Sequence, residues 1–340
     1  MSEKTVDNAM SEKTVDNAMP EKTVDGTMSH KKTLEKSYNE FLLTKLKQIF
    51  SKKELEAYLE ANERQRPTVL RVNTLLTRRK DLAYTLSQRK VETGNLEWTD
   101  SALVAFKSEV PLGATPEYLA GYYMIQGASS MLPVLNLGVE ENMRVVDLCA
   151  APGGKSTHIG ALLNNTGVLY ANDVCKDRIF SLKSNLARMG IQNAIVTNMD
   201  AASFNVGKVD RVLLDAPCSG TGVISKDPSI KTSKSFEEIK KISKIQKKLI
   251  LHAFDMLKSG GYMVYSNCSI LVEENEEVVD YLLTQRKNAK ISDLTIAVGK
   301  EGFTHFRSEN FNGSLTKARR IYPHVHNMDG FFYVKIFKAE

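Results

Sequence analysis

Two cysteines stand at matching places in the sequence, each where a run of apolar residues typical of a buried strand ends. Cys218 lies in LLDAPCSGTG and Cys268 lies in MVYSNCS. A cysteine can act as a nucleophile where its surroundings lower the thiol pKa below its usual value of about 8.5. The alternative is a buried apolar cysteine that only packs, which we expect of Cys149 and Cys175. From residue type and spacing alone, both interpretations stay open for Cys218 and Cys268.

A glycine-rich loop precedes both cysteines. VVDLCAAPGGKS predicts a strand that ends in an acidic residue, then a tight turn, then a helix. In an α/β sheet this is the place where nucleotides bind, and glycine lets a backbone approach a ligand closely. The loop does not match G-x-G-x-x-G, which weakens a dinucleotide interpretation. It also lacks the first glycine of the G-x-x-x-x-G-K-[ST] motif, which disfavours a nucleotide triphosphatase.

Three aspartates close successive predicted strands after that loop. Asp173 ends the strand in LYANDVC, Asp200 ends VTNMDA and Asp215 precedes the first cysteine motif. One such aspartate alone would be taken for a helix cap or a turn residue. Three in sequence favour S-adenosylmethionine, a cationic nucleoside without phosphates. Asp173 suits its ribose hydroxyls and Asp200 its adenine amino group.

The elements that must position these residues alternate regularly over the second half of the chain, which predicts a parallel sheet covered on both faces. The last segment, ARRIYPHVHNMDGFFYVKIFK, predicts a hairpin that closes the sheet antiparallel. The expected strands are 144–149, 167–173, 194–200, 211–216 and 261–267, and the expected helices are 154–164, 176–189, 236–258 and 274–286.

The first part of the chain has a different pattern. Residues 1–28 repeat a nonapeptide that begins MSEKTVDNA, and we expect a disordered tail there. A helical pattern over 34–60 breaks at Ser51, and a small α+β module is expected over about 64–110, with a strand that ends near Thr77. The module is rich in basic residues, which favour contact with an RNA backbone or merely form a solvated face. These residues are Arg64, Arg66, Arg71, Arg78, Arg79, Lys80, Arg89 and Lys90.

Composition sets weaker limits. The chain has 340 residues and a formal charge of +6, a mild lean toward polyanionic partners. Its four cysteines form no C-x-x-C pair, so we expect a reducing compartment and neither disulfides nor a metal site. No apolar run approaches membrane length. The lysines of the predicted helix EIKKISKIQKKL are expected to face mostly water.

Taken together, DLCAAPGGKSTHI, ANDVCKDR, LLDAPCSGTGVI and YSNCS with VEENEEVV resemble the Nop/Sun family of RNA (cytosine-5) methyltransferases. The flanking phrases VPLGATPEYLAGYYMIQGASSMLPV and KARRIYPHVHNMDGFFYVKIFK resemble its nucleolar branch, which modifies large-subunit rRNA. The resemblance runs from about residue 35 to the C-terminus. One departure is Asn267, where the family's second cysteine motif usually has threonine.

The resemblance implies a fold and a set of partners. It implies a Rossmann-like class I methyltransferase sheet with an N-terminal α+β RNA-binding module, S-adenosylmethionine as cofactor, and rRNA in pre-ribosomal particles as partner. It also implies a nuclear, nucleolar protein without membrane contact, which we expect to be a monomer. The domains expected are a tail at 1–28, a helical segment at 29–62, the module at 63–125 and the methyltransferase domain at 126–340.

It also implies roles for the site residues. Carbon 5 of cytosine is a poor nucleophile until a thiolate adds to carbon 6. DNA cytosine-5 enzymes use a Pro-Cys thiol for this step, but the RNA family assigns attack to the later motif, hence to Cys268. Cys218 then assists product release and Asp215 faces ring N3. The cofactor contacts implied are Cys149, Ala150, Ala151, Pro152, Gly153, Gly154, Lys155, Asp173, Arg178, Asp200 and Asp215.

Two other functions remain open from the sequence. The first is a ribosome-assembly scaffold that keeps the methyltransferase fold without catalysis. Two features leave this hypothesis open: Asn267 and the short N-terminal segment. The second is a small-molecule methyltransferase, which the basic N-terminal module disfavours.

Overall fold

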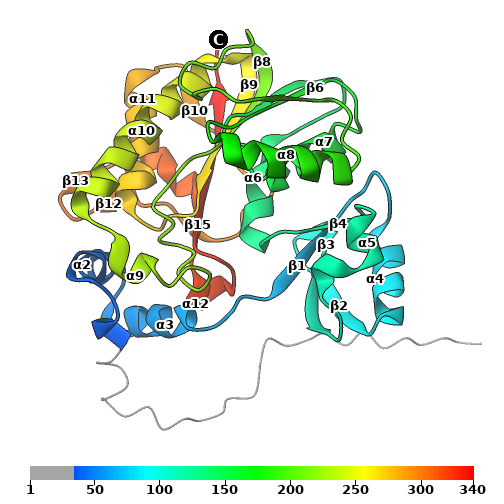
Figure 1. Cartoon of the computed structure of the whole chain (residues 1–340). Helices are drawn as coiled ribbons and strands as arrows, with labels where there is room; N and C mark the ends of the chain where they lie inside the picture. Colours follow the sequence, from blue (N-terminus) through cyan, green and yellow to red (C-terminus); the bar gives the residue numbers. More distant parts are fainter. Residues whose placement is uncertain (1–33) are drawn as a thin grey trace, which may run out of the picture.

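A large twisted sheet runs through the centre of the molecule, and a smaller sheet lies beside it (Figure 1). The structure, a computed structural model, describes residues 34–340. The repeat at 1–28, expected to form a disordered tail, lies outside the described residues. Within the described part of the chain, no helix is long and apolar enough to cross a membrane.

The large sheet has nine strands, and its main path runs β11-β14-β15-β9-β8-β5-β6-β7. The five strands from β5 to β9 are parallel, and β15 then pairs antiparallel with β9. The expected parallel sheet with an antiparallel C-terminal closure is therefore confirmed. Its strands are β5 (Arg144–Asp147), β6 (Val168–Asn172), β7 (Ala194–Thr197), β8 (Val209–Asp215), β9 (Leu257–Asn267), β10 (Ala289–Ile291), β11 (Lys300–Glu301), β14 (Arg319–Ile321) and β15 (Phe331–Lys338).

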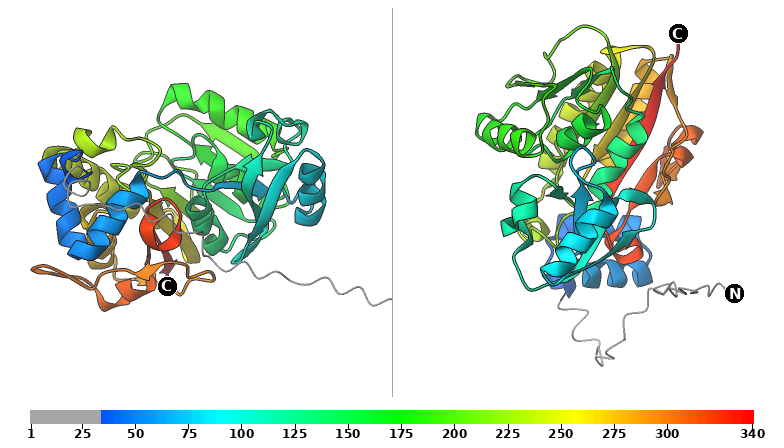
Figure 2. Two further views of the ribbon diagram at one scale, coloured as in Figure 1. Left: turned by 90° about the horizontal axis from the view of Figure 1, so that it is seen from below. Right: turned by 90° about the vertical axis from the view of Figure 1, so that its right-hand side faces the viewer.

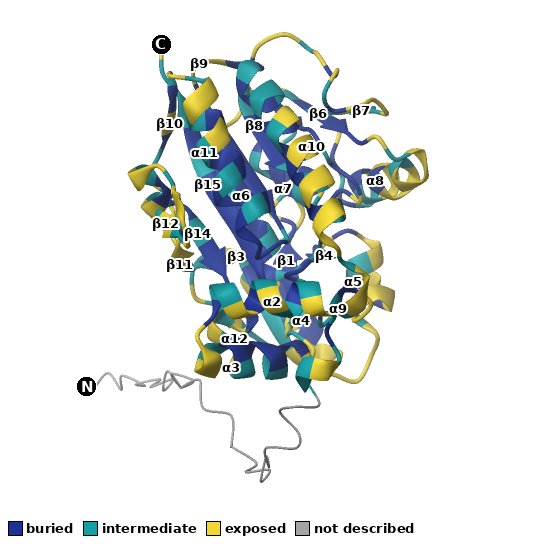
Figure 3. Cartoon of the chain, turned by 90° about the vertical axis from the view of Figure 1, so that its left-hand side faces the viewer, coloured by how far each residue is buried: buried dark blue, intermediate teal, exposed yellow. Residues whose placement is uncertain are grey.

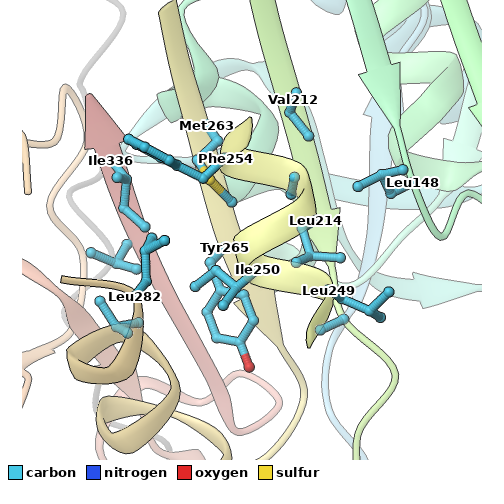
Figure 4. Packing of buried hydrophobic residues seen from close by; sticks show 14 of the residues in the cluster. Leu148, Val212, Leu214, Leu249, Ile250, Phe254, Met263, Tyr265, Leu282 and Ile336 are labelled. Carbon is cyan, nitrogen blue, oxygen red and sulfur yellow. The ribbon is translucent and has the colours of Figure 1, made fainter. Parts of the chain in front are cut away.

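Helices cover both faces of this sheet because successive side chains on a strand point to opposite sides. Val145 belongs to the buried cluster that includes residues of α6 and α7, whereas its neighbour Val146 belongs to the cluster that includes residues of α10 and α11. Figure 3 shows the central strands buried and much of the outward surface of α10 exposed. Figure 4 shows α10 laid against β8 and β9 through Leu214, Ile250 and Met263. The helices are α6 (Leu132–Leu137), α7 (Gly154–Leu162), α8 (Lys176–Arg188), α9 (Ile230–Ser233), α10 (Phe236–Asp255), α11 (Glu276–Gln285) and α12 (Pro323–His326).

Several strands end earlier than their sequence patterns predict. β6 ends directly before Asp173, whose carboxylate accepts a hydrogen bond from the backbone N–H of Cys175 (2.9 Å). β7 ends at Thr197, and the N–H of Met199 beyond it donates to the side chain of Asn172 (3.1 Å). Asp200 follows in a turn where its carboxylate accepts from the N–H of Ala202 (2.9 Å). Such local bonds turn the chain and compete with the ladder of the sheet. The aspartates therefore stand in the loops at the carboxyl edge of the sheet.

The small sheet has the order β2-β3-β1-β4 and is antiparallel throughout. Leu70 and Val72 of β1 pack against α4, and Val69 and Arg71 face the large sheet. β1 ends at Val72, well before Thr77, because a turn begins at residue 73. The elements are β1 (Thr68–Val72), α4 (Arg79–Gln88), β2 (Val91–Leu96), β3 (Thr99–Ser108), α5 (Pro116–Leu119) and β4 (Tyr123–Ile125).

Two helices precede the small sheet, α2 (Glu40–Ile49) and α3 (Lys52–Asn62). Ser51 breaks the helical pattern as expected, because it caps α3 in a reciprocal capping box with Glu54. Both helices lie on the far side of the molecule from the small sheet (Figure 2). They bury their apolar faces against Ile224, Ile270 and Tyr322. The helices therefore support the loop that follows Cys268.

Candidate active site

The two cysteine motifs meet at the carboxyl edge of the large sheet. Cys218 follows β8 and Cys268 follows β9, and these two strands are parallel neighbours in which Asp215 pairs with Ser266. The two Sγ atoms are 3.0 Å apart, and both thiols are free. Parallel strands end at the same edge, so residues fifty positions apart in the chain converge there. One site therefore holds both candidate thiols.

A carboxylate and a cation stand beside the thiols. Asp215 Oδ2 accepts a hydrogen bond from Lys155 Nζ at 2.7 Å, and Asp215 Oδ1 accepts one from Ser266 Oγ at 2.8 Å. Lys155 comes from the glycine-rich loop and also lies over the ring of Phe331, 5.7 Å from its centroid. The two bonds fix the carboxylate of Asp215, and Lys155 links the thiol region to the glycine-rich loop.

The glycine-rich loop is held from several sides. Asp173 Oδ2 accepts from the N–H of Ala151 at 3.0 Å, and Arg178 donates to the carbonyl of the same residue. Gly153, the N-cap of α7, has a φ of +103°, a backbone conformation that residues other than glycine rarely adopt. Asp173 is buried with both oxygens already engaged, whereas Asp200 is exposed. Asp173 thus anchors the loop, in addition to any ligand contact.

An acidic group just before this loop, Asp147, is buried, and a thiol within the loop, that of Cys149, is partly buried. Asp147 ends β5 and accepts from Ser156 Oγ at 2.7 Å, and its burial raises the pKa of the carboxyl to about 7. Burial also raises the pKa of the Cys149 thiol, with the carboxylates of Asp147 and Asp215 adding to the effect. A thiol with a raised pKa is a poor nucleophile, in line with the packing role expected of Cys149.

A buried glutamate that the sequence analysis did not single out connects the two cysteine loops. Glu274 accepts from the N–H of Ser219 (2.8 Å), from the hydroxyl of Ser219 (2.5 Å) and from the hydroxyl of Ser269. Ser219 follows Cys218 and Ser269 follows Cys268. Burial raises the pKa of the Glu274 carboxyl above its ordinary value. Its only sequence signal is the glutamate run of VEENEEVV, whose members cannot be told apart by pattern.

Asn267, the residue that departs from the family pattern, fits this network. Its Oδ1 accepts from the N–H of Ser269 at 2.8 Å, and its Nδ2 donates to the carbonyl of Glu274 at 3.1 Å. The side chain therefore bridges both ends of the loop that carries Cys268. Asn267 is buried and its hydrogen bonds brace the position of the thiol.

The C-terminal phrase supports the same loop from outside. Arg320 of β14 donates two hydrogen bonds of 3.0 Å to the carboxylate of Glu276 and a further one to the carbonyl of Ile270. Both partners of this ion pair are fully buried. Removing one partner of such a pair leaves an uncompensated buried charge. The C-terminal segment that contains Arg320 therefore has a structural role, which its sequence pattern did not indicate.

Most of the basic cluster in the small module has internal partners. Arg71 is buried and donates to Gln126 Oε1 (2.7 Å), to Thr157 Oγ1 (2.8 Å) and to the carbonyl of Gly154, so the interpretation as an RNA contact is wrong for this residue. The alternation along β1 turns it toward the large sheet. Gln126 and Ser129 are buried as well, and Gln126 also donates to the carbonyl of Ser130 at 3.1 Å. Three others form ion pairs, namely Arg79 with Asp100, Arg89 with Glu117 and Lys90 with Glu109.

The lysines of α10 stand as expected. Four of them are exposed, and Lys247 pairs with Glu277 at 3.5 Å. The exposed lysines are Lys240, Lys241, Lys244 and Lys248.

Loss of the Glu274 carboxylate is expected to slow turnover. Glu274→Ala removes the acceptor that fixes both cysteine loops, and a misplacement of about 1 Å at a reacting group can lower kcat about a hundredfold. Glu274→Gln is expected to retain most of kcat, because its amide oxygen still accepts from the Ser219 N–H. The measurement is kcat for the methyl transfer that the resemblance of the sequence implies, with thermal melting to establish the folded fraction. Glu273→Ala, a partly exposed neighbour, is the matched control. A Glu274→Gln enzyme as slow as Glu274→Ala would contradict this role.

A mostly parallel sheet with a glycine-rich loop after β5 and carboxylates at the ends of the next strands is the fold of the class I methyltransferases. The model of the 16S rRNA methyltransferase RsmB/F family matches residues 134–337, and a ferredoxin-like domain of RsmF/B-like methyltransferases matches 38–111. The chain belongs to this family of RNA methyltransferases.

Similar proteins place it more narrowly. The chain is 53% identical over 309 residues to a 28S rRNA (cytosine-C(5))-methyltransferase of Mus musculus, covering 89% of this chain and 39% of that protein. It is 49% identical over 312 residues to the 25S rRNA (cytosine-C(5))-methyltransferase nop2 of Schizosaccharomyces pombe, covering 88% and 51%. The expected resemblance to the large-subunit branch is confirmed. The chain spans about half the length of these relatives or less.

The fold also matches a solved structure. A methyltransferase homolog protein from Pyrococcus horikoshii superposes with a TM-score of 0.83 at 31% identity. The match covers 92% of this chain and 100% of that one. The small sheet and the large sheet thus both have counterparts in one known molecule.

Proposed function

We propose that this protein transfers a methyl group from S-adenosylmethionine to carbon 5 of a cytosine in RNA, with large-subunit rRNA in pre-ribosomal particles as substrate. The observation that carries the proposal is the pair of thiols 3.0 Å apart beside the Asp215–Lys155 pair. Methylation of an exocyclic amine needs no thiol, whereas carbon 5 needs one to add to carbon 6. The names of the similar proteins support the same reaction.

The residues at the sheet edge fit S-adenosylmethionine, which supplies an electrophilic methyl group when bound. Asp200 is exposed and retains an oxygen for a donor, Asp173 retains lone pairs beyond its two backbone bonds, and the loop 149–155 offers backbone groups. The loop does not match the phosphate-binding glycine motifs, which agrees with a nucleoside ligand that carries no phosphates. Arg178, which holds the carbonyl of Ala151, completes the set by positioning the loop.

The chain's own groups divide the reaction between them. Cys268 Sγ bonds to carbon 6, and the electron pair gained at carbon 5 bonds to the methyl group as the bond from that methyl to the sulfonium sulfur breaks, which leaves S-adenosylhomocysteine. Asp215, held by Lys155 and Ser266, faces ring N3, where a proton favours the addition. Loss of the proton from carbon 5 then breaks the Cys268 Sγ–C6 bond and returns the thiolate.

The electrostatics of the thiol pair support this division. The contact with Cys268 and, next, burial raise the pKa of Cys218 well above its ordinary value. Cys218 therefore stays protonated and can donate toward a thiolate at Cys268. Once Cys268 is bonded to carbon 6, its sulfur carries no charge and the largest cause of the raised pKa weakens. Cys218 can then take part in removing the carbon 5 proton.

The scaffold alternative gains no support from the site. Both thiols, Asp215 and the supporting Glu274 network are all in place. We further propose the division into 1–28, 29–62, 63–125 and 126–340, a monomeric state and a nucleolar location.

Methyl transfer to RNA is the direct test. With labelled S-adenosylmethionine, the wild-type chain is expected to label an unmodified large-subunit rRNA transcript at cytosine, as bisulfite sequencing can verify. A small-subunit rRNA transcript and free cytidine are the controls and are expected to accept little. Equal transfer to free cytidine would indicate a small-molecule enzyme, and no transfer to any RNA would refute the proposed activity.

A further inference from the structure

A pocket of about 400 Å³ lies between the small sheet and the large one. One wall comes from the small sheet, with Phe106 on the face that looks away from α4, Trp98 in the turn between β2 and β3, and Ile125 at the end of β4. The other wall comes from the loops of the methyltransferase fold, with Lys226 and Asp329. Its volume falls in the range of small-molecule pockets, which starts at about 300 Å³. Neither the catalytic thiols nor the glycine-rich loop line it.

The aromatic wall follows from the register of β1, β2 and β3. Val69 stands opposite Val104, so Val104 and Phe106 share the face that looks toward the large sheet. Phe106 lies over Gly94, where a Cβ would come within 2.5 Å of its ring. With 67% of its surface exposed, Phe106 presents a flat apolar ring, and Ile125, which also lines the pocket, is 41% exposed. Exposed apolar side chains gathered in a pocket are typical of a binding site.

The opposite wall is charged and polar. Lys226 is exposed and pairs with Asp329, which is only 8% exposed and whose Oδ1 has no hydrogen-bond partner among the described residues. Arg66 lines the same pocket and donates to carbonyl and amide oxygens; burial lowers the pKa of its guanidinium, and the nearby carboxylate of Asp329 acts against this. A buried acceptor without a donor is costly, which points to a ligand that brings an N–H.

The pocket adjoins the reacting thiol. Gly330, next to Asp329, donates its N–H to the carbonyl of Gly222 at 2.7 Å, and Gly222 donates to the carbonyl of Cys268 at 2.8 Å. A Cβ at Gly222 would meet the Gly330 carbonyl oxygen at 2.1 Å, so the three backbones are in contact. On the other side of Gly330, Phe331 lies under Lys155. Whatever occupies the pocket is therefore a near neighbour of a base held at Cys268.

We propose that this pocket binds one unpaired nucleotide of the RNA strand next to the target cytosine; the inference rests on the proposed function. The base stacks on Phe106 and Trp98, its N–H donor meets Asp329, and Arg66 and Lys226 hold the adjoining phosphates. Flat aromatic rings with cations at the rim are how proteins hold single-stranded nucleic acid. An apolar peptide would offer no anionic groups to Arg66 and Lys226 and no side-chain donor to the unpaired Oδ1 of Asp329.

Trp98 gives a direct readout because it is the single tryptophan of the chain. Titration with a short single-stranded oligoribonucleotide that contains cytosine, without cofactor, is expected to quench its fluorescence with the same midpoint as the rise in anisotropy of a labelled copy. Binding by anisotropy with unchanged Trp98 emission would overturn the proposal. Absence of any RNA binding or methylation would instead refute the proposed function.

Replacement of the stacking ring is the second test. Phe106→Ala is expected to raise the RNA Kd and KM about tenfold, as loss of one stacked base predicts, and to leave kcat and cofactor affinity unchanged. Phe106→Tyr is expected to restore binding, because it keeps the ring. Tyr84→Ala removes an equally exposed ring of α4, on the other side of the small sheet, and is the matched control. An unchanged RNA KM in folded Phe106→Ala, while wild type methylates RNA, would overturn the pocket assignment alone.

Discussion

Cys268→Ala is expected to lower methyl transfer to RNA by about a thousandfold or more, the scale at which removal of a nucleophile acts. Without this thiol no bond to carbon 6 forms, and carbon 5 stays unreactive toward the methyl donor. The neighbouring Cys218 is not expected to substitute: this variant removes the contact with Cys268, the largest cause of the raised pKa of Cys218, but burial, the next cause, remains. The measurement is labelled methyl transfer with bisulfite sequencing of the product RNA.

The loss of activity in Cys268→Ala reports on the chemical step only if the variant still binds RNA and cofactor. RNA and cofactor affinities of Cys268→Ala are expected to match wild type, so the loss falls on kcat. Cys175→Ala is the matched control, because Cys175 is also a partly buried free thiol and contributes only its backbone N–H to Asp173. Full activity in Cys268→Ala together with a loss in Cys218→Ala would exchange the roles of the two cysteines.

The sequence predicted well the features that depend on residues close together in the chain. The order of strands and helices follows from apolar periodicity, and the break at Ser51 follows from a capping box four residues long. The two cysteines converge because parallel neighbours end at one edge, which the β8–β9 pairing realises. The ends of β6 and β7 lie earlier than predicted because side chains take backbone N–H groups there: Asp173 accepts from Cys175 after β6, and Asn172 accepts from Met199 after β7.

What could not be predicted depends on pairs far apart in the chain. Arg71 carries the same charge as its basic neighbours, and only the docking of β1 on α7 shows that it binds Gln126 and Thr157 instead of RNA. Glu274 lies in a run of glutamates, and its role emerges when Ser219 and Ser269 meet around it. The pocket beside Phe106 needs both sheets in place before it exists.

Cys218→Ala is expected to trap the enzyme on its RNA. Attack by Cys268 does not need the second thiol to lose its proton, so the bond to carbon 6 and the transfer of methyl can both proceed. The step that fails is removal of the carbon 5 proton. We assign this step to the Cys218 thiol, whose sulfur lies 3.0 Å from that of Cys268. A covalent protein–RNA adduct should therefore accumulate while turnover falls.

The adduct distinguishes release from attack. On a denaturing gel, Cys218→Ala incubated with RNA and cofactor is expected to show a slower band that nuclease removes, and wild type far less of it. The double variant Cys218→Ala with Cys268→Ala should show none, because without Cys268 no bond to carbon 6 can form. Normal turnover of Cys218→Ala without adduct would mean that carbon 5 loses its proton to another group, and the raised pKa of Cys218 would then serve only to hold a proton beside the attacking thiolate.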